Sequence, residues 1–180
     1  MAGPLIIPFK GVSPRIAADA FIAPNAVIIG DVEIGPQASI WFNCVLRGDV
    51  NSIRVGARSN LQDGTIVHCD GPYHNGKGFP TIIGDDVLVG HMVMVHGAIL
   101  ENRAFVGMKA MLMNGTVVEG DAMVAAGALV SGKRIPKGQL WAGSPAKFMR
   151  ELSKKDVGGM RAGVERYVVN GQTYREQLGS

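Results

Sequence analysis

Cysteine is scarce in this chain of 180 residues, which has only Cys44 and Cys69. Two thiols are too few for the disulfide framework that stabilises small secreted domains. The short apolar stretch Leu5–Phe9 precedes its lysine, Lys10, whereas a secretory signal places its positive charge first. We therefore expect a soluble cytoplasmic protein.

The chain also lacks a strong excess of positive or negative charge, and it lacks long apolar runs. Eighteen basic and fifteen acidic residues leave a net charge of +3, too small an excess to indicate a nucleic-acid or membrane partner. No apolar run reaches the roughly 18 residues that a membrane span requires. Aromatic residues make up only 6%, so the core must be built from aliphatic and small side chains.

Glycine is abundant, with 25 residues, and an aliphatic residue returns every six positions through much of the chain. These anchors are Ile16, Ile22, Ile28, Ile34, Ile40, Leu46, Val55, Leu61, Val67, Ile83, Val89, Val95, Leu100, Val106, Leu112, Val118, Val124 and Val130. The residue four places after an anchor is mostly small, as at Ala26, Ala104 and Ala110. A period of six is not the spacing of an amphipathic helix, and it is too regular for the strands of a β-sandwich.

Three short strands, one for each hexad, can close a triangular coil of 18 residues with the anchors stacked inside. The pattern resembles the hexapeptide-repeat family of left-handed parallel β-helices. The resemblance implies an all-β solenoid of about six coils between Val12 and Val130. We expect residues 1–143 to form this β-helix domain together with an N-terminal lead-in.

Residues 144–180 are expected to form a C-terminal α-helical segment packed on the β-helix within the same domain. Ser144 followed by Pro145 is typical of a helix start, and Phe148, Met149 and Leu152 give that helix an apolar side. A second apolar stripe at helical spacing comprises Val157, Met160, Val164, Tyr167 and Val168. We expect this segment to be structural rather than catalytic.

Two insertions interrupt the repeat, and interruptions of a regular scaffold are loops in which sites are often built. Leu46 and Val55 are nine residues apart instead of six, and Val67 and Ile83 are sixteen apart. The first insertion therefore has three residues and the second has ten. All four histidines lie in this middle region, at His68, His74, His91 and His96.

The spacing of the histidines predicts which of them meet. His68 and His96 are 28 residues apart, equal to one coil of 18 plus the ten inserted residues, and each directly follows an anchor. They should stand one above the other at the same corner, about 4.8 Å apart along the axis. Arg47 belongs to the same column one coil below, because 21 residues are one coil plus three. Two imidazoles stacked in this way can share a metal ion.

His91 lies five residues before His96, and five extended residues span roughly 16 Å. The two side chains therefore lie on different faces and cannot meet easily within one chain. If His91 is a ligand, it must serve a neighbouring copy, and a threefold trimer with one metal at each interface satisfies this requirement. The alternative is that the histidines are ordinary hydrogen-bonded surface or interface residues, and for His74 this interpretation is preferred.

These residues carry a second resemblance, to the gamma-class carbonic anhydrases and especially to their bacterial branch. The matching segments are Arg47-Gly48-Asp49 with Asn51, Asn60-Leu61-Gln62-Asp63-Gly64, Val67-His68, and Gly90-His91 through Val95-His96. The resemblance implies a homotrimer whose metal is held by His68 and His96 of one subunit and His91 of the next.

The same resemblance implies roles for four further residues. Gln62 would orient the metal-bound water, with Asp63 close by. Arg47 and Asp49 would form a salt bridge near the subunit boundary, where Arg47 could also steady bicarbonate. For each pair a purely structural role in its turn is the alternative.

Three neutral imidazoles leave the metal dipositive with a position open for water. The metal lowers the pKa of that water from 15.7 to about 7, and the resulting hydroxide can attack carbon dioxide. The expected activity is therefore that of a lyase, the reversible hydration of carbon dioxide to bicarbonate at the trimer interfaces. Zinc is the default metal, and Fe²⁺ or Co²⁺ tolerate the same ligands.

The sequence departs from the best-studied type of the family at the proton-export positions. Val50 stands where that type has a glutamate, and the inserted loop has Asp70 but no glutamate. His74 could substitute as the proton relay. Two other functions stay open: a hexapeptide-repeat acyltransferase that uses acyl-CoA and a histidine base, and a non-catalytic trimeric scaffold locked by its metal.

Overall fold

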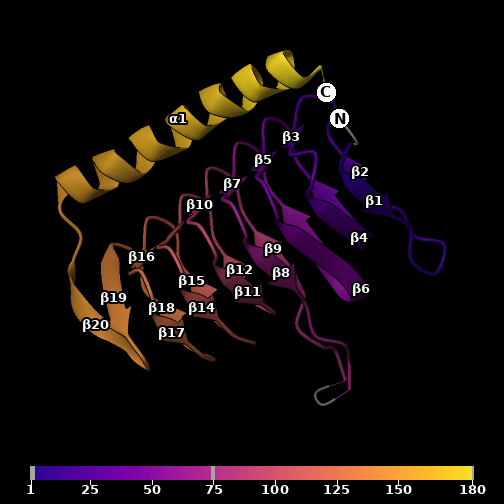
Figure 1. Ribbon diagram of the computed structural model, residues 1–180. Helices are drawn as coiled ribbons and strands as arrows, with labels where there is room; N and C mark the ends of the chain where they lie inside the picture. The colour runs from indigo at the N-terminus through magenta and orange to yellow at the C-terminus, as the bar shows by residue number, and fades with distance from the viewer. Residues whose placement is uncertain (1–2, 74–75, 180) are drawn as a thin grey trace.

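Parallel strands stacked coil upon coil form the body of the protein in a computed structural model that describes residues 3–73 and 76–179 (Figure 1). The anchors Leu46, Val67, Val95 and Leu112 are paired in this order across neighbouring coils, and each is fully buried. The repeat of six therefore produces one continuous aliphatic core, as the sequence predicts. The protein is a left-handed parallel β-helix of the hexapeptide-repeat type.

Within the described residues the strands form two sheets that make up the three faces of a prism. The twelve-stranded sheet contains β1 (Leu5–Ile7), β2 (Arg15–Ile16), β4 (Val27–Ile34), β6 (Val45–Val55), β8 (Ile66–His68), β9 (Thr81–Ile83), β11 (Met94–His96), β12 (Ile99–Leu100), β14 (Met111–Leu112), β15 (Val117–Val118), β17 (Leu129–Val130) and β18 (Arg134–Ile135). The eight-stranded sheet contains β3 (Phe21–Ile22), β5 (Ser39–Ile40), β7 (Asn60–Leu61), β10 (Leu88–Val89), β13 (Phe105–Val106), β16 (Met123–Val124), β19 (Gln139–Gly143) and β20 (Ala146–Glu151).

The larger sheet covers two faces because β6 continues through a corner. Its first residues pair with β8 and its last residues pair with β9, which lies on the adjacent face. The three-residue insertion after Leu46 is therefore part of an extended strand, and the expectation that it forms a loop is wrong. The extra residues are accommodated by a shift of register against β4, between Gly30 and Val32.

The solenoid has about eight turns, more than the six that the hexad series predicts. Stacking begins at β1, which pairs with β4, and continues through β18 and β19 beyond the last anchor, Val130. These terminal coils escape the sequence pattern because Ile135 and Trp141 are not spaced at six residues from Val130.

The C-terminal helix α1 (Lys154–Leu178) begins ten residues after Ser144, so the predicted start at Ser144 is wrong. Residues 146–151 instead form β20, which turns back antiparallel against β19. The helix starts where a capping box is available: the Ser153 hydroxyl accepts from the Asp156 amide, and the Asp156 carboxylate accepts from the Ser153 amide. Ser144 has Lys147 at the corresponding position and lacks this partner.

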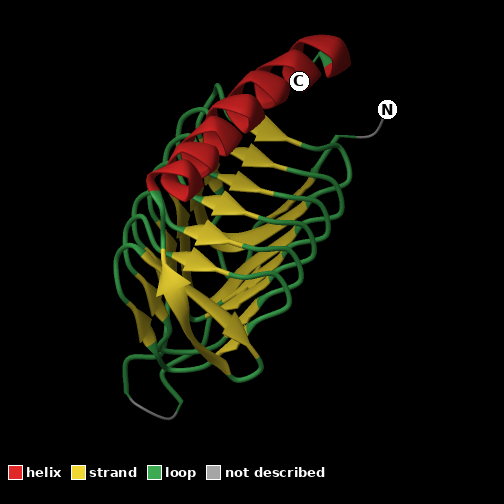
Figure 2. Ribbon diagram, turned by 90° about the vertical axis from the view of Figure 1, so that its left-hand side faces the viewer, coloured by secondary structure: helices red, strands yellow, loops and turns green. Residues whose placement is uncertain are grey.

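Figures 1 and 2 show α1 lying along the coils, over the face that carries β3, β5, β7 and β10. Its buried side chains include Met160, Val164 and Val168, three members of the predicted stripe. Gly171 permits close approach, because a Cβ there would lie 3.3 Å from the Cβ of Ser39. No helix within residues 3–73 or 76–179 combines the length and the apolar character needed to cross a membrane.

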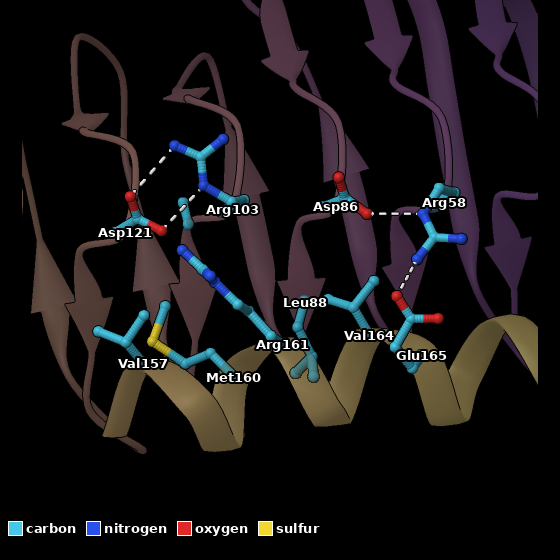
Figure 3. A pocket seen from close by; sticks show the side chains of 11 residues that line it. Arg58, Asp86, Leu88, Arg103, Asp121, Val157, Met160, Arg161, Val164 and Glu165 are labelled. Carbon is cyan, nitrogen blue, oxygen red and sulfur yellow. Dashed lines mark hydrogen bonds and ion pairs between the residues drawn. The ribbon is translucent and has the colours of Figure 1, made fainter. Parts of the chain in front are cut away.

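A pocket of ≈ 420 Å³ lies between α1 and the neighbouring coils (Figure 3). On its polar side Arg58 pairs with Asp86 of the coils and with Glu165 of the helix. Arg103 pairs with Asp121, and both of these belong to the coils. Each of these carboxylates already has a guanidinium partner, and the pair of Arg58 with Glu165 links the helix to the solenoid. None of the residues that line it is a histidine.

Candidate metal centre

His68 and His96 lie side by side on β8 and β11, directly opposite each other in the strand register. Arg47 is paired with His68 in the register of β6 and β8, and these two strands are neighbours in Figure 1. The column predicted from the spacing is therefore confirmed at the level of the backbone. The two imidazoles approach closely, with Nδ1 of His68 3.0 Å from Nε2 of His96.

Asp49 fixes the orientation of His68. Its Oδ1 lies 3.0 Å from Nε2 of His68, and its Oδ2 accepts a hydrogen bond of 2.5 Å from Nη1 of Arg47. A carboxylate only accepts hydrogen bonds, so Nε2 of His68 carries the ring proton and Nδ1 keeps a lone pair. The three-residue insertion in β6 is what brings Asp49 to this position.

Asn114 fixes the orientation of His96. Its Oδ1 lies 2.7 Å from Nδ1 of His96, and its Nδ2 donates to Oδ2 of Asp70 at 2.8 Å. Because the carboxylate of Asp70 accepts a hydrogen bond from the NH₂ group of the Asn114 amide, the amide oxygen must face His96. Nδ1 of His96 therefore carries the proton, and its Nε2 keeps a lone pair.

The two facing nitrogens both present lone pairs, and 3.0 Å between them without a proton is repulsive. A cation between them removes that repulsion. Two nitrogens bound to one zinc ion at 2.0–2.1 Å with a tetrahedral angle are about 3.3 Å apart, close to the spacing seen here. Metal-binding histidines also commonly donate their other N–H to an oxygen, as both do here. The donor set therefore fits a metal ion.

The charge states of His68 and Asp49 agree with this arrangement. Burial lowers the pKa of His68, reinforced by Arg47 and His96 and opposed by Asp49, which favours the neutral imidazole that binds metals. Burial acts to raise the pKa of Asp49, but hydrogen bonds from His68 and Arg47 outweigh it and hold the pKa below its usual value.

His91 lies at a different corner, in the turn between β10 and β11. Its Nδ1 lies 2.8 Å from Oδ2 of Asp63, and both side chains are 41% exposed. Asp63 engages Nδ1, which leaves Nε2 of this exposed ring as the nitrogen open to a ligand. Within the described part of one chain, no three His, Cys, Asp or Glu side chains gather closely enough to hold a metal.

Gln62 and Asp63 belong to the corner of His91 rather than to that of His68. The amide of Gln62 bonds the carbonyl of Val89, and the amide of Met92 bonds the carbonyl of Asp63, so the two turns are stacked. Gln62 is buried and donates from Nε2 to Oδ1 of Asn60 at 3.1 Å. Nδ2 of Asn60 is buried and has no partner among the described atoms.

Exposed apolar side chains flank both corners. Ile66 precedes His68 on β8 and points to the same side, since alternate residues of a strand share a face. Met111 continues this column above β11, while Met92 and Met108 lie at the corner of His91. Both histidine corners are therefore bordered by exposed apolar side chains.

Neither cysteine belongs to the centre. Cys69 is adjacent to His68 but points into the core, where burial raises the pKa of its thiol. Cys44 is buried as well, and burial raises the pKa of its thiol to about 12. His74, the proposed relay, lies outside the described residues. Sequence reasoning missed Asn114, whose one signal is its place 18 residues, or one regular coil, after His96.

Comparison with known proteins adds three findings. A family model described as "Bacterial transferase hexapeptide (six repeats)" matches residues 13–48. A relative named carbonic anhydrase from Geobacillus kaustophilus is 43% identical over 95% of this chain and 91% of its own length. Gamma carbonic anhydrase 2, mitochondrial, of Arabidopsis thaliana is 51% identical over 87% of this chain but only 56% of its own length.

A solved structure completes the comparison. A hexapeptide transferase family protein from Anaplasma phagocytophilum is 43% identical, with a TM-score of 0.88 over 94% of this chain and 98% of that protein. The chain spans only 53–56% of the length of two Arabidopsis relatives that it matches, so it corresponds to part of those longer proteins.

Proposed function

The chain belongs to the gamma-class carbonic anhydrase family of hexapeptide-repeat proteins, and from this premise we propose that it hydrates carbon dioxide reversibly to bicarbonate. The proposed enzyme is a cytoplasmic homotrimer. Each of its three sites holds a metal ion, zinc by default, between His68 and His96 of one subunit and His91 of the partner subunit.

One observation carries the proposal: Nδ1 of His68 and Nε2 of His96 face each other at 3.0 Å, while the other nitrogen of each ring has its own oxygen partner. Asp49 and Asn114 each accept a hydrogen bond from the ring nitrogen that faces away from the pair, so both tautomers suit metal binding. The third imidazole, His91, likewise has one ring nitrogen, Nδ1, held by a carboxylate, that of Asp63. Its Nε2 lies at a different corner from His68 and His96 of the same chain.

The apolar surface beside both corners supports the trimer. Ile66 and Met111 border the histidine pair, and Met92 follows His91 directly. Contact between these two different surfaces is heterologous, and a heterologous contact closes into a ring when the rotation is threefold. The same closure would bring His91 of the partner subunit to the pair.

A metal bound at this centre would act as a Lewis acid that lowers the pKa of water and polarises the substrate. The residues of the chain have separate tasks. Asp49 holds the proton on Nε2 of His68, and Arg47 is held by Asp49 with the rest of its guanidinium free to bind an anionic product. Gln62 and Asp63 would orient the reacting water from the corner of His91, as the family resemblance implies.

Proton export sets a limit on this enzyme. Val50 is apolar at the position next to Asp49, so this position offers no relay, and without another relay such as His74 the proton has to pass directly to buffer. We therefore expect the hydration rate to rise with buffer concentration.

Two alternatives are separated by the same measurements. An acyltransferase is favoured by the transferase description of the similar Anaplasma structure. It needs one histidine as a base and no metal, which leaves the facing lone pairs unexplained. A non-catalytic scaffold would bind the metal without hydrating carbon dioxide.

The test combines metal analysis with stopped-flow hydration of carbon dioxide at several buffer strengths. We expect about one metal per chain, and His96→Ala should lower both metal content and kcat/KM by more than about 100-fold, because it removes a ligand. A wild-type protein that holds metal but hydrates nothing at any buffer strength would establish the scaffold. A metal-free protein that transfers acetyl groups from acetyl-CoA would establish the transferase.

A further inference from the structure

The base of the ten-residue insertion lies directly behind the histidine pair. Asp70, two residues after His68, accepts a hydrogen bond of 2.8 Å from Nδ2 of Asn114, although the two residues are 44 apart in sequence. Asn114 in turn places its Oδ1 2.7 Å from Nδ1 of His96. These contacts form one continuous chain from the insertion to the second imidazole.

Asp70 is held from two sides. Its backbone exchanges two hydrogen bonds of 2.9 Å with Phe79, which closes the insertion into a narrow neck. Its carbonyl also accepts from Nδ2 of Asn51 on β6 at 2.9 Å. The neck and β6 therefore hold the backbone of Asp70, which carries the carboxylate.

Close packing brings Asn114 to this point. A Cβ at Gly97 would lie 2.3 Å from Oδ1 of Asn114 and 2.7 Å from the Cβ of Phe79. Gly97 also has a φ of +57°, a backbone conformation that residues other than glycine rarely adopt. Only glycine at this position lets the amide reach the ring of His96.

An asparagine amide has nearly the same shape when its oxygen and nitrogen are exchanged, so shape alone cannot orient it. The carboxylate of Asp70 distinguishes the two orientations, because it accepts hydrogen bonds and repels the amide oxygen. If the amide were reversed, its NH₂ group would donate to Nδ1 of His96. The ring proton would then move to Nε2, the nitrogen that faces His68.

We propose that Asp70 and Asn114 act as a positioning pair that fixes the tautomer and the ring orientation of His96 and so keeps its Nε2 bare for a metal. The neck of the insertion thus serves the centre, as Asp49 does for His68, but through one more residue. The use of that nitrogen rests on the proposed metal function, whereas the tautomer itself does not.

The experiment measures zinc affinity by chelator competition in the wild-type protein and in four variants. Asn114→Ala should weaken binding 10–100-fold, the usual cost of losing an outer-shell partner. Asp70→Ala should weaken it several-fold, and Asp70→Asn should restore it, because the amide oxygen of the substituted side chain still accepts from Asn114. The matched control Asn25→Ala, which removes an amide contact of 2.8 Å with Asn43 in the N-terminal coils, should leave affinity unchanged.

A second readout needs no metal. In ¹⁵N-histidine-labelled apo protein at pH 8, the spectrum of His96, assigned by its loss in His96→Gln, should show the Nδ1–H form. Asn114→Ala should shift it toward the Nε2–H form, while thermal unfolding confirms that the variant is folded. Unchanged zinc affinity in Asn114→Ala, or an unchanged tautomer, overturns the proposal. If the wild-type protein binds no zinc, the proposed function fails and the tautomer alone decides this inference.

Discussion

The histidine rings at the two corners are held in place to different degrees. At one corner His68 and His96 are partly buried, and each is fixed by a residue that is itself held by another, Asp49 by Arg47 and Asn114 by Asp70. At the other corner His91 is 41% exposed and has one exposed partner, Asp63.

Under the proposed function, this difference would divide the work between a rigid pair of ligands, His68 and His96, and an adaptable third ligand, His91. Two stacked ligands must keep their spacing before anything binds, so both need fixed partners. A ligand that arrives with another subunit gains its order from the interface, and exposure in the isolated chain is what such a residue requires. Three experiments test this contrast.

The largest effect is expected from mixing two inactive variants. His96→Ala loses the pair and His91→Ala loses the closing ligand, so each trimer alone should bind metal more than about 100-fold more weakly. When the two are co-refolded in equal amounts, about one quarter of the interfaces combine an intact pair with an intact His91. We expect metal content and hydration to recover to about that fraction. No recovery, with mixed trimers shown to form, would place all three ligands in one chain.

A smaller effect should separate the partners of the two corners. Asp49→Ala removes a side chain that is 17% exposed and holds both His68 and Arg47, so zinc affinity should fall roughly 10–100-fold. Asp63→Ala removes a more exposed partner, and its effect on zinc affinity should be several-fold less. Chelator titration of both variants measures the ratio. Equal losses would contradict the contrast between a rigid and an adaptable corner.

The smallest effect should come from a change remote from both corners. Hydrogen bonds from Arg150, then from the Ser153 hydroxyl and amide, lower the pKa of Asp156. Because its folded pKa lies below the unfolded value of about 3.9, its contribution is present above that pH and is lost as pH falls below it. Asp156→Asn should lower Tm by a few degrees at pH 7, and the difference from wild type should shrink below about pH 4. Zinc affinity at neutral pH should not change, and a change would link α1 to the centre.

The register of the column was predictable because a solenoid preserves it. Every regular coil adds one turn, and an insertion lengthens one corner without moving the strands that follow. His68 and His96 therefore pair across the ten inserted residues, as arithmetic predicts. The same arithmetic could not identify Asn114. The role of Asn114 depends on its contact with Asp70, and Asp70 lies at the base of the insertion, outside the regular repeat.

The C-terminal segment shows the opposite case. Phe148 and Met149 are compatible with the apolar side of a helix or with a strand, and short apolar runs do not distinguish the two. Residues 146–151 form a strand because they pair with the neighbouring strand β19 in an antiparallel hairpin. The stripe from Val157 to Val168 was long enough to identify a helix despite Gly158 and Gly159, which lie against open space.

The reversal of direction at β20 has a consequence for the protein in the cell. A stack of parallel rungs ends in a row of unsatisfied amides and carbonyls, which invites another chain to add itself and propagate into a fibre. Here the final rung, β19, is covered by an antiparallel strand that carries Lys147 and Arg150 on its exposed residues. On this face, the two charges and the antiparallel direction of β20 therefore disfavour the addition of another chain.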